Sequence, residues 1–129
     1  MPDLFSVDGI AAWRARLDAS ESFRTAARGW SGSVLLVEHD DAGALRNTYI
    51  ALDDGALLHS RLATDTDIRD AEFVLRASTD TWRNLVHGEV ELIAAALRGA
   101  LRLERGSVFR LIPHAGAASA MLREAGNAP

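Results

Sequence analysis

Side chains that commonly carry catalysis or bind metals are sparse in this sequence of 129 residues. The serine at position 31 follows a glycine by two residues, but Ser33 stands where a nucleophile elbow needs its second glycine. No glycine-rich loop follows a predicted strand to open a helix, as phosphate binding requires. The four histidines are far apart, and no two have the spacing of a metal-binding pair: His39, His59, His87 and His114. These patterns predict no catalytic site, no metal and no cofactor.

The acidic side chains offer no stronger candidate. The stretch 65–70 resembles a calcium loop, but Ile68 stands where such a loop needs a ligand or a glycine, so we expect a polar loop there. An enzyme such as a small isomerase would need a buried acid that faces a cavity. The acids nearest to suitable elements are Glu72, Glu89 and Glu91, and the pattern places each of them outward. We therefore expect that this protein is not an enzyme.

Composition bounds the class of protein. A chain of this length forms one domain, residues 1–129, and its 48% hydrophobic and 25% charged residues are typical of a folded soluble protein. A net charge of −4 argues against nucleic acid or an anionic membrane as the main partner. Without cysteine there are neither disulfides nor thiolate metal sites. The acidic first residues resemble no secretory signal and no apolar run spans a membrane, so we expect a cytoplasmic protein. The wealth of Ala, Arg, Leu and Gly is typical of a GC-rich bacterial genome.

The elements that would position a binding site centre on residues 78–106. Ser78 can cap a helix in which Trp82, Leu85 and Val86 share one apolar face, and Gly88 fits the left-handed position that ends it. A second helix is predicted over 89–98. Val90, Ile93 and Leu97 form one apolar stripe on it, which Leu92, Ala95 and Ala96 widen, and Gly99 ends it. We expect so apolar a helix to be buried on more than one side, or part of its apolar face to meet something else. Residues 100–105 then alternate as a strand, with Leu101 and Leu103 inward.

The preceding residues predict helices and then strands. A helix carries Ile10, Trp13 and Leu17 on one face, a second short helix carries Phe23, and Trp30 packs with them under a sheet. Strands are predicted over 33–39, 47–52, 56–62 and 70–77. The first of these is central because it contains four apolar residues in a row, and the next two are joined by an Asp-Gly hairpin. The order predicts an α+β fold: a five-stranded, mainly antiparallel sheet with helices covering one face.

The last segment is predicted to be a thin helix. Residues 114–125 are rich in alanine and glycine, and their only large apolar side chains are Met121 and Leu122. We expect this helix to pack closely but weakly and to be the element that moves.

Residues in this order and spacing resemble the core signature of the sterol carrier protein type 2 family. The signature residues are Leu85, Gly88, Ala95, Gly99, Leu101 and Leu103, although the next glycine, Gly106, stands one place later than in the family. The stretch LDASESFRTAARGWSG is also similar to the opening of stand-alone prokaryotic members. The resemblance implies a five-stranded sheet under helices that enclose an apolar lipid tunnel.

The resemblance and the apolar helix together suggest a non-catalytic protein that binds or transfers a long-chain apolar small molecule. A fatty acid, an acyl thioester, or a sterol-like or quinone-like lipid would fit such a cavity. The terminal helix would be its gate. Arg76, Arg83 and His87 are the nearest cations for a headgroup. The expected lining residues are Trp82, Leu85, Val86, Ile93, Leu97, Leu101, Phe109, Ile112, Met121 and Leu122.

A second interpretation stays open. The same residues can fill a dry core, in which case the domain would be an accessory module for protein interaction or dimerisation. A homodimer is compatible with this interpretation. Its distinguishing features would be an exposed apolar patch and oligomers in solution.

Overall fold

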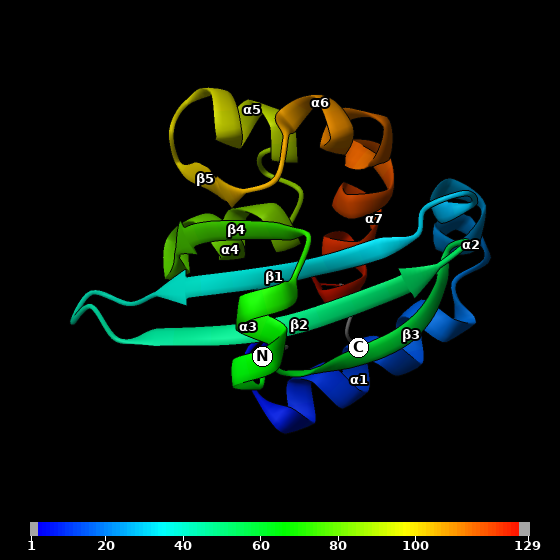
Figure 1. Ribbon diagram of the computed structural model, residues 1–129, viewed down its shortest axis with the longest axis horizontal. Helices are drawn as coiled ribbons and strands as arrows, with labels where there is room; N and C mark the ends of the chain where they lie inside the picture. The colour runs from blue at the N-terminus through cyan, green and yellow to red at the C-terminus, as the bar shows by residue number, and fades with distance from the viewer. Residues whose placement is uncertain (1–2, 127–129) are drawn as a thin grey trace.

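One five-stranded sheet forms the frame of the protein, in a computed structural model that describes residues 3–126. The strand order is β3-β2-β1-β4-β5, and all neighbours are antiparallel except β1 and β4, which are parallel. This arrangement confirms the α+β fold predicted from the sequence (Figure 1). The strands are β1 (Gly32–His39), β2 (Leu45–Asp53), β3 (Ala56–Leu62), β4 (Phe73–Ser78) and β5 (Leu101–Arg105).

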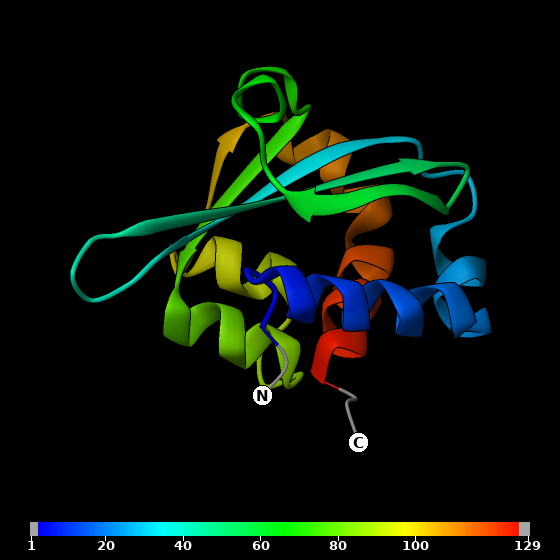
Figure 2. The ribbon, with the colours of Figure 1, turned by 90° about the horizontal axis from the view of Figure 1, so that it is seen from below.

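The helices lie on both sides of this sheet. In Figure 2, α1, α4 and α7 lie together on one side, and α3 lies on the other. The sheet therefore has a thick cover on one face and a small one on the opposite face. The helices are α1 (Val7–Ala19), α2 (Glu21–Ala27), α3 (Asp65–Asp70), α4 (Thr79–Val86), α5 (Leu92–Leu97), α6 (Val108–Leu111) and α7 (Ala115–Gly126), with a 3-10 turn η1 (Ile112–His114).

The central strand β1 is buried on both faces, as its apolar run predicted. Val34 and Leu36 belong to the main core, which also contains Trp13, Phe23 and Trp30. The alternate residues of β1 belong to a second, smaller cluster under α3, which contains Leu35, Val37, Ala71 and Val74. A period of two along the strand thus divides one apolar run between two cores.

Local signals read from the sequence hold at several element ends. Ser6, Ser20 and Ser78 each cap a helix by accepting a hydrogen bond from a backbone amide of its first turn. Between β2 and β3, Asp54 and Gly55 both have positive φ, at 49° and 80°. Two such residues in succession form the tight turn whose twist matches a β-hairpin.

Residues 65–70 form the helix α3, so the prediction of a polar loop was wrong. Thr64 and Asp67 form a capping box, in which each side chain accepts from the other residue's backbone amide. Asp67 is buried and accepts two hydrogen bonds from Arg61, at 2.8 and 3.0 Å. The Arg61 guanidinium lowers the pKa of Asp67 to about 2. Polar anchoring therefore produces a helix that apolar periodicity did not reveal.

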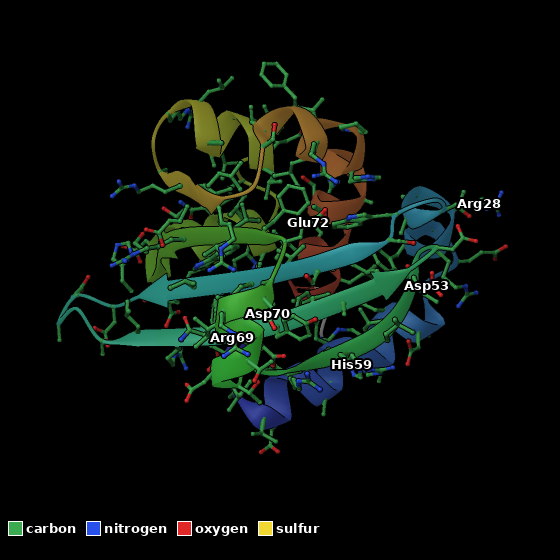
Figure 3. All side chains as sticks on the ribbon, viewed as in Figure 1. Arg28, Asp53, His59, Arg69, Asp70 and Glu72 are labelled. Atoms are coloured by element: carbon green, nitrogen blue, oxygen red, sulfur yellow. The ribbon has the colours of Figure 1, made fainter. Side chains whose placement is uncertain are left out.

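The helix α3 also changes the strand that follows. We predicted a strand from residue 70, but β4 begins at Phe73. Ala71 belongs to the cluster under α3, whereas Phe73 and Leu75 belong to the main core. In Figure 3 the labelled Arg69 and Asp70 mark α3, in front of the sheet.

The helix predicted over 89–98 is shorter than expected, and its buried face is different. The helix α5 has six residues, of which Leu92 and Ala95 are buried. Val90 and Ile93 are only half-buried, and Leu97 is 84% exposed. Of the predicted apolar face, α5 therefore buries Leu92 and Ala95, which were expected to widen the stripe. Burial of the stripe of Val90, Ile93 and Leu97 itself was wrongly predicted.

The terminal helix α7 packs closely against the main core, as predicted, and several contacts anchor it there. Met121 and Leu122 are almost fully buried, as are three of its alanines. The Trp13 indole N–H donates to the Met121 carbonyl oxygen at 2.7 Å. The Arg16 guanidinium donates to the carbonyl oxygens of Glu124 and Ala125, at 2.7 and 3.2 Å.

Candidate functional site

A pocket of about 290 Å³ opens where α4 meets the N-terminal segment and the linked ends of β1 and β2. We call it the α4 pocket. Its walls combine apolar and charged residues: Asp3, Leu4, Phe5, Glu38, Arg46, Thr79, Trp82, Arg83, Val86 and His87. The four apolar residues among them are buried, at 8% exposure or less. This volume lies at the lower end of the range typical of ligand pockets, about 300–1,000 Å³.

Trp82 is the largest apolar wall of the α4 pocket, and the fold fixes its position. The strand β4 runs parallel to β1 and leads directly into α4, so that Trp82 lies against β1. Its indole N–H donates to the Val37 carbonyl oxygen at 3.0 Å. The Phe5 ring meets the indole edge to face, with ring centroids 5.9 Å apart. Because the polar atom of Trp82 is already bonded and only 2% of the residue is exposed, its contribution to the pocket is a small area of apolar ring edge.

A charged cluster borders this apolar surface. The Arg46 guanidinium donates to Glu38 at 2.7 Å and to Asp3 at 2.9 Å, and it lies over the Phe5 ring, 5.5 Å from its centroid. The hydrogen bond to Glu38 is the main cause that raises the pKa of Arg46 above its ordinary value. Two carboxylates thus accompany one guanidinium, so this cluster does not offer a free cation to an anionic ligand.

The cations able to meet a ligand's headgroup lie on α4 and just after it. Arg83 and His87 both line the α4 pocket and are exposed. Arg83 makes an exposed ion pair with Asp80 at 3.2 Å, a contact that an anionic ligand can replace at little cost. Arg76, the third cation predicted from the sequence, lies on β4 within 4.0 Å of Glu104 and does not line the α4 pocket.

A second pocket of about 350 Å³ shares Val86 and His87 with the α4 pocket. We call it the α7 pocket, because α7 supplies four of its residues. Its wall is more polar, with Ser20, Ser22, Phe23, Val86, His87, Ala120, Arg123, Glu124 and Gly126. Both pockets are therefore lined by residues at the C-terminal end of α4.

The residues predicted to line a cavity fall into three groups in the structure. Trp82 and Val86 line the α4 pocket, and Leu85 lines a recess of only about 10 Å³. The core members Leu101, Met121 and Leu122 are packed among other core side chains. Ile93 is half-buried, and three residues face solvent: Leu97, Phe109 and Ile112. The structure therefore brings only part of the predicted lining together.

Sequence reasoning missed Leu4 and Phe5, which form the wall opposite α4. Both are buried, and the Leu4 carbonyl oxygen accepts a hydrogen bond from the Thr48 hydroxyl at 2.7 Å. A signal for Phe5 was present in the sequence. It directly precedes the capping Ser6 and stands at staple spacing to Ile10, a pattern that fixes how a chain enters a helix.

Within residues 3–126, no group of three or more His, Asp or Glu side chains is arranged to hold a metal ion. None of the helices there has both the length and the apolar character needed to cross a membrane.

Comparisons with known proteins place this fold. No protein-family model matches the sequence, and no curated protein matches it. Among solved structures, a crystal structure of sterol carrier protein 2 is 28% identical, with a TM-score of 0.85 over 98% of this chain and 100% of that one. A protein of Thermus thermophilus described as possibly a sterol carrier protein is also 28% identical, with a TM-score of 0.79 over 97% of this chain and 89% of that one.

A more distant neighbour was solved with a ligand. Sterol carrier protein 2 of Aedes aegypti, in complex with the C16 fatty acid palmitate, is 17% identical to this chain. The TM-score is 0.56, over 85% of this chain and 91% of that one, a likeness in fold alone.

Proposed function

We propose that this chain, a domain similar to sterol carrier protein 2, binds a long-chain apolar lipid in the α4 pocket. The lipid would be held by burial of its apolar surface, without covalent chemistry. The observation that carries the proposal is the pocket itself, in which Leu4, Phe5, Trp82 and Val86 form apolar walls beside exposed cations. An apolar chain gains about 25 cal/mol for each Å² of surface that it removes from water, and it needs few polar contacts for this.

A fatty acid is the ligand class that fits this site best. Its carboxylate would lie near Arg83 and His87, while its chain covers Trp82 and extends across Val86 toward the α7 pocket. The similarity to sterol carrier protein 2, and the palmitate held by the Aedes aegypti protein, support this assignment. An acyl thioester carries the same chain and is the second choice. Sterol-like or quinone-like lipids have ring systems wider than an acyl chain, so they fit a pocket of about 290 Å³ less well.

Fluorescence titration with palmitate and with the alcohol of the same chain length tests the proposal. Thr79 is a half-buried wall residue, and Thr79→Trp would fill the α4 pocket without removing a core side chain. We expect this variant to lose binding of both ligands, and the matched control Thr66→Trp, on α3, to keep it. Binding of palmitate by Thr79→Trp at wild-type affinity would overturn the site.

The headgroup contact has its own test. Arg83→Glu should weaken binding of palmitate by about two- to fivefold, as for an exposed ion pair, and leave binding of the alcohol unchanged. Arg28→Glu is the control, because Arg28 lies at the end of α2 and outside both pockets (Figure 3). An equal loss for both ligands would show that Arg83 does not meet the carboxylate.

The exposed apolar residues Leu97 and Phe109 favour a second candidate, a module for dimerisation. It predicts a mass of two chains in analytical ultracentrifugation and no uptake of palmitate. A monomer that binds palmitate would exclude it as the main function.

A further inference from the structure

Exposed apolar side chains gather on one short segment of this protein. Within residues 3–126, eight large apolar side chains are exposed, and four of them belong to residues 97–112. Leu97 is 84% exposed and Phe109 is 81% exposed, more than the other six. We call this group the α5–α6 cap: Leu97, Val108, Phe109 and Ile112.

The cap is exposed because its helices bury other residues. The helix α5 turns Leu92 and Ala95 inward, and α6 turns only Leu111 inward. Figure 1 shows both helices at the same end of the molecule, beside the edge strand β5 and away from β3. Leu97 and Phe109 thus project from one end of the protein with no core to enter.

Charge is distributed unevenly between this end and the rest of the chain. Residues 97–112 contain four arginines and one glutamate, which gives +3, whereas the whole chain carries −4, so the remaining residues carry −7. Arg98 and Arg102 are exposed and make no ion pair with any residue in the range 3–126. Arg105 donates to three neutral carbonyl groups, so its charge stays uncompensated. Arg110 is 3.4 Å from Glu72.

We propose that the α5–α6 cap docks this protein on the surface of an anionic lipid bilayer. Leu97 and Phe109 enter the boundary between headgroups and acyl chains, and Arg98 and Arg102 meet the anionic headgroups. The net charge of −4 for the whole chain argued against such a partner. Residues 97–112, however, carry a net charge of +3. The negative remainder of the protein is repelled by the same surface, which orients the cap toward it.

A bilayer fits this surface better than a second copy of the chain does. A symmetric dimer through the cap would place two faces of +3 against each other, and like charges at an interface oppose association. Exposed bulky side chains that stand next to arginines in the sequence, Leu97 beside Arg98 and Phe109 beside Arg110, match a fluid interface, in which each side chain is buried separately.

Vesicle co-sedimentation of the full chain tests the proposal. The probes are vesicles of phosphatidylcholine alone and vesicles that also contain phosphatidylglycerol. Wild type should bind the anionic vesicles and lose them in high salt, because screening shortens the range of the attraction to a few ångströms. Leu97→Glu combined with Phe109→Glu should lower the partition coefficient by about tenfold or more, since two anchors become anionic.

Matched controls separate this surface from general stickiness. Leu58→Glu combined with Leu62→Glu changes two exposed apolar residues of β3, outside the cap, and should leave vesicle binding unchanged. Arg98→Glu combined with Arg102→Glu should abolish the preference for anionic vesicles. Circular dichroism checks that each variant is folded.

Two results would overturn the proposal. One is vesicle binding by the Leu97→Glu, Phe109→Glu variant at the wild-type level. The other is a wild-type protein that does not bind anionic vesicles. A wild type that forms a dimer through the cap and does not bind vesicles belongs to this second result. Palmitate titration without vesicles reports separately on the α4 pocket, so failure of docking and failure of lipid binding are distinguishable.

Discussion

The helices α5 and α7 are both rich in alanine but have opposite surroundings. The helix α5 is the more apolar of the two, with three large apolar residues among six, whereas α7 has two among twelve. The sequence favoured burial for the first and weak packing for the second. In the structure α7 buries Met121 and Leu122 in the main core, whereas α5 leaves Leu97 in solvent. Apolar content therefore did not decide which helix is central.

Polar anchors explain the difference. The helix α7 receives hydrogen bonds from Trp13 and Arg16 of α1, and His114 just before it stacks on Trp30, with the rings 5.2 Å apart and nearly parallel. The helix α5 has no side-chain cap at its first residue. A thin helix held at several points packs closely, and a more apolar helix without such anchors can lie at the edge.

The largest effect is expected in α7. Met121→Ala should lower the free energy of unfolding by about 2–5 kcal/mol, because it removes a fully buried side chain and leaves a cavity. Urea unfolding followed by circular dichroism measures this loss. A loss below about 1 kcal/mol would mean that α7 packs only weakly, as predicted from its small number of large apolar side chains.

An anchor of α7 comes next in size. Trp13→Phe removes the indole donor to the Met121 carbonyl and replaces a fully buried side chain by a smaller one, at a cost of about 1–3 kcal/mol. Hydrogen exchange of the α7 amides is the sharper readout. We expect exchange to accelerate throughout α7. Unchanged protection there would show that α1 does not hold the helix.

The helix α3 extends the comparison to a helix held almost wholly by polar contacts. Because the pKa of Asp67 is lowered from 3.8 to about 2 in the fold, its ionised form stabilises the protein above about pH 4, and this contribution is lost as the pH falls to 2. Asp67→Asn should therefore unfold with a weaker dependence on pH in that window. Denaturant midpoints of both proteins between pH 5 and pH 2 test this. Parallel curves would contradict the role of the Arg61 contact.

The smallest effect on stability is expected in the α5–α6 cap. Leu97→Ala and Phe109→Ala should each change the free energy of unfolding by less than about 0.5 kcal/mol, as for exposed residues. Thermal unfolding of the two variants measures it. A loss comparable to that of Met121→Ala would place both side chains in a core and remove the contrast between the two ends.

Much of the fold followed from local patterns. The apolar run of β1, the Asp-Gly hairpin and the serine caps each act within a few residues of their own position. Gly88 and Gly99, read as helix ends, both have positive φ, at 73° and 78°. These signals, in their order, also carried the resemblance to the family that structural comparison supports.

The rest depended on contacts between distant residues. Trp13 holds α7 across 108 positions of the chain, which no period in the sequence shows. Arg61 is only six positions from Asp67, but this polar contact, which holds α3, has no apolar period either. The same holds for the site. Trp82 and Val86 were predicted from helical spacing, whereas Leu4 and Phe5 reach the α4 pocket only because the N-terminal segment folds over β2.

Native mass spectrometry of the protein purified from a bacterial host, followed by solvent extraction, tests the central claim most directly. We predict a bound apolar species at one molecule per chain, identified as a fatty acid or its thioester after extraction. The Thr79→Trp variant should carry none. A ligand-free mass for the wild type, together with no uptake of a fluorescent fatty acid, would contradict lipid binding and leave the resemblance as a statement about the fold.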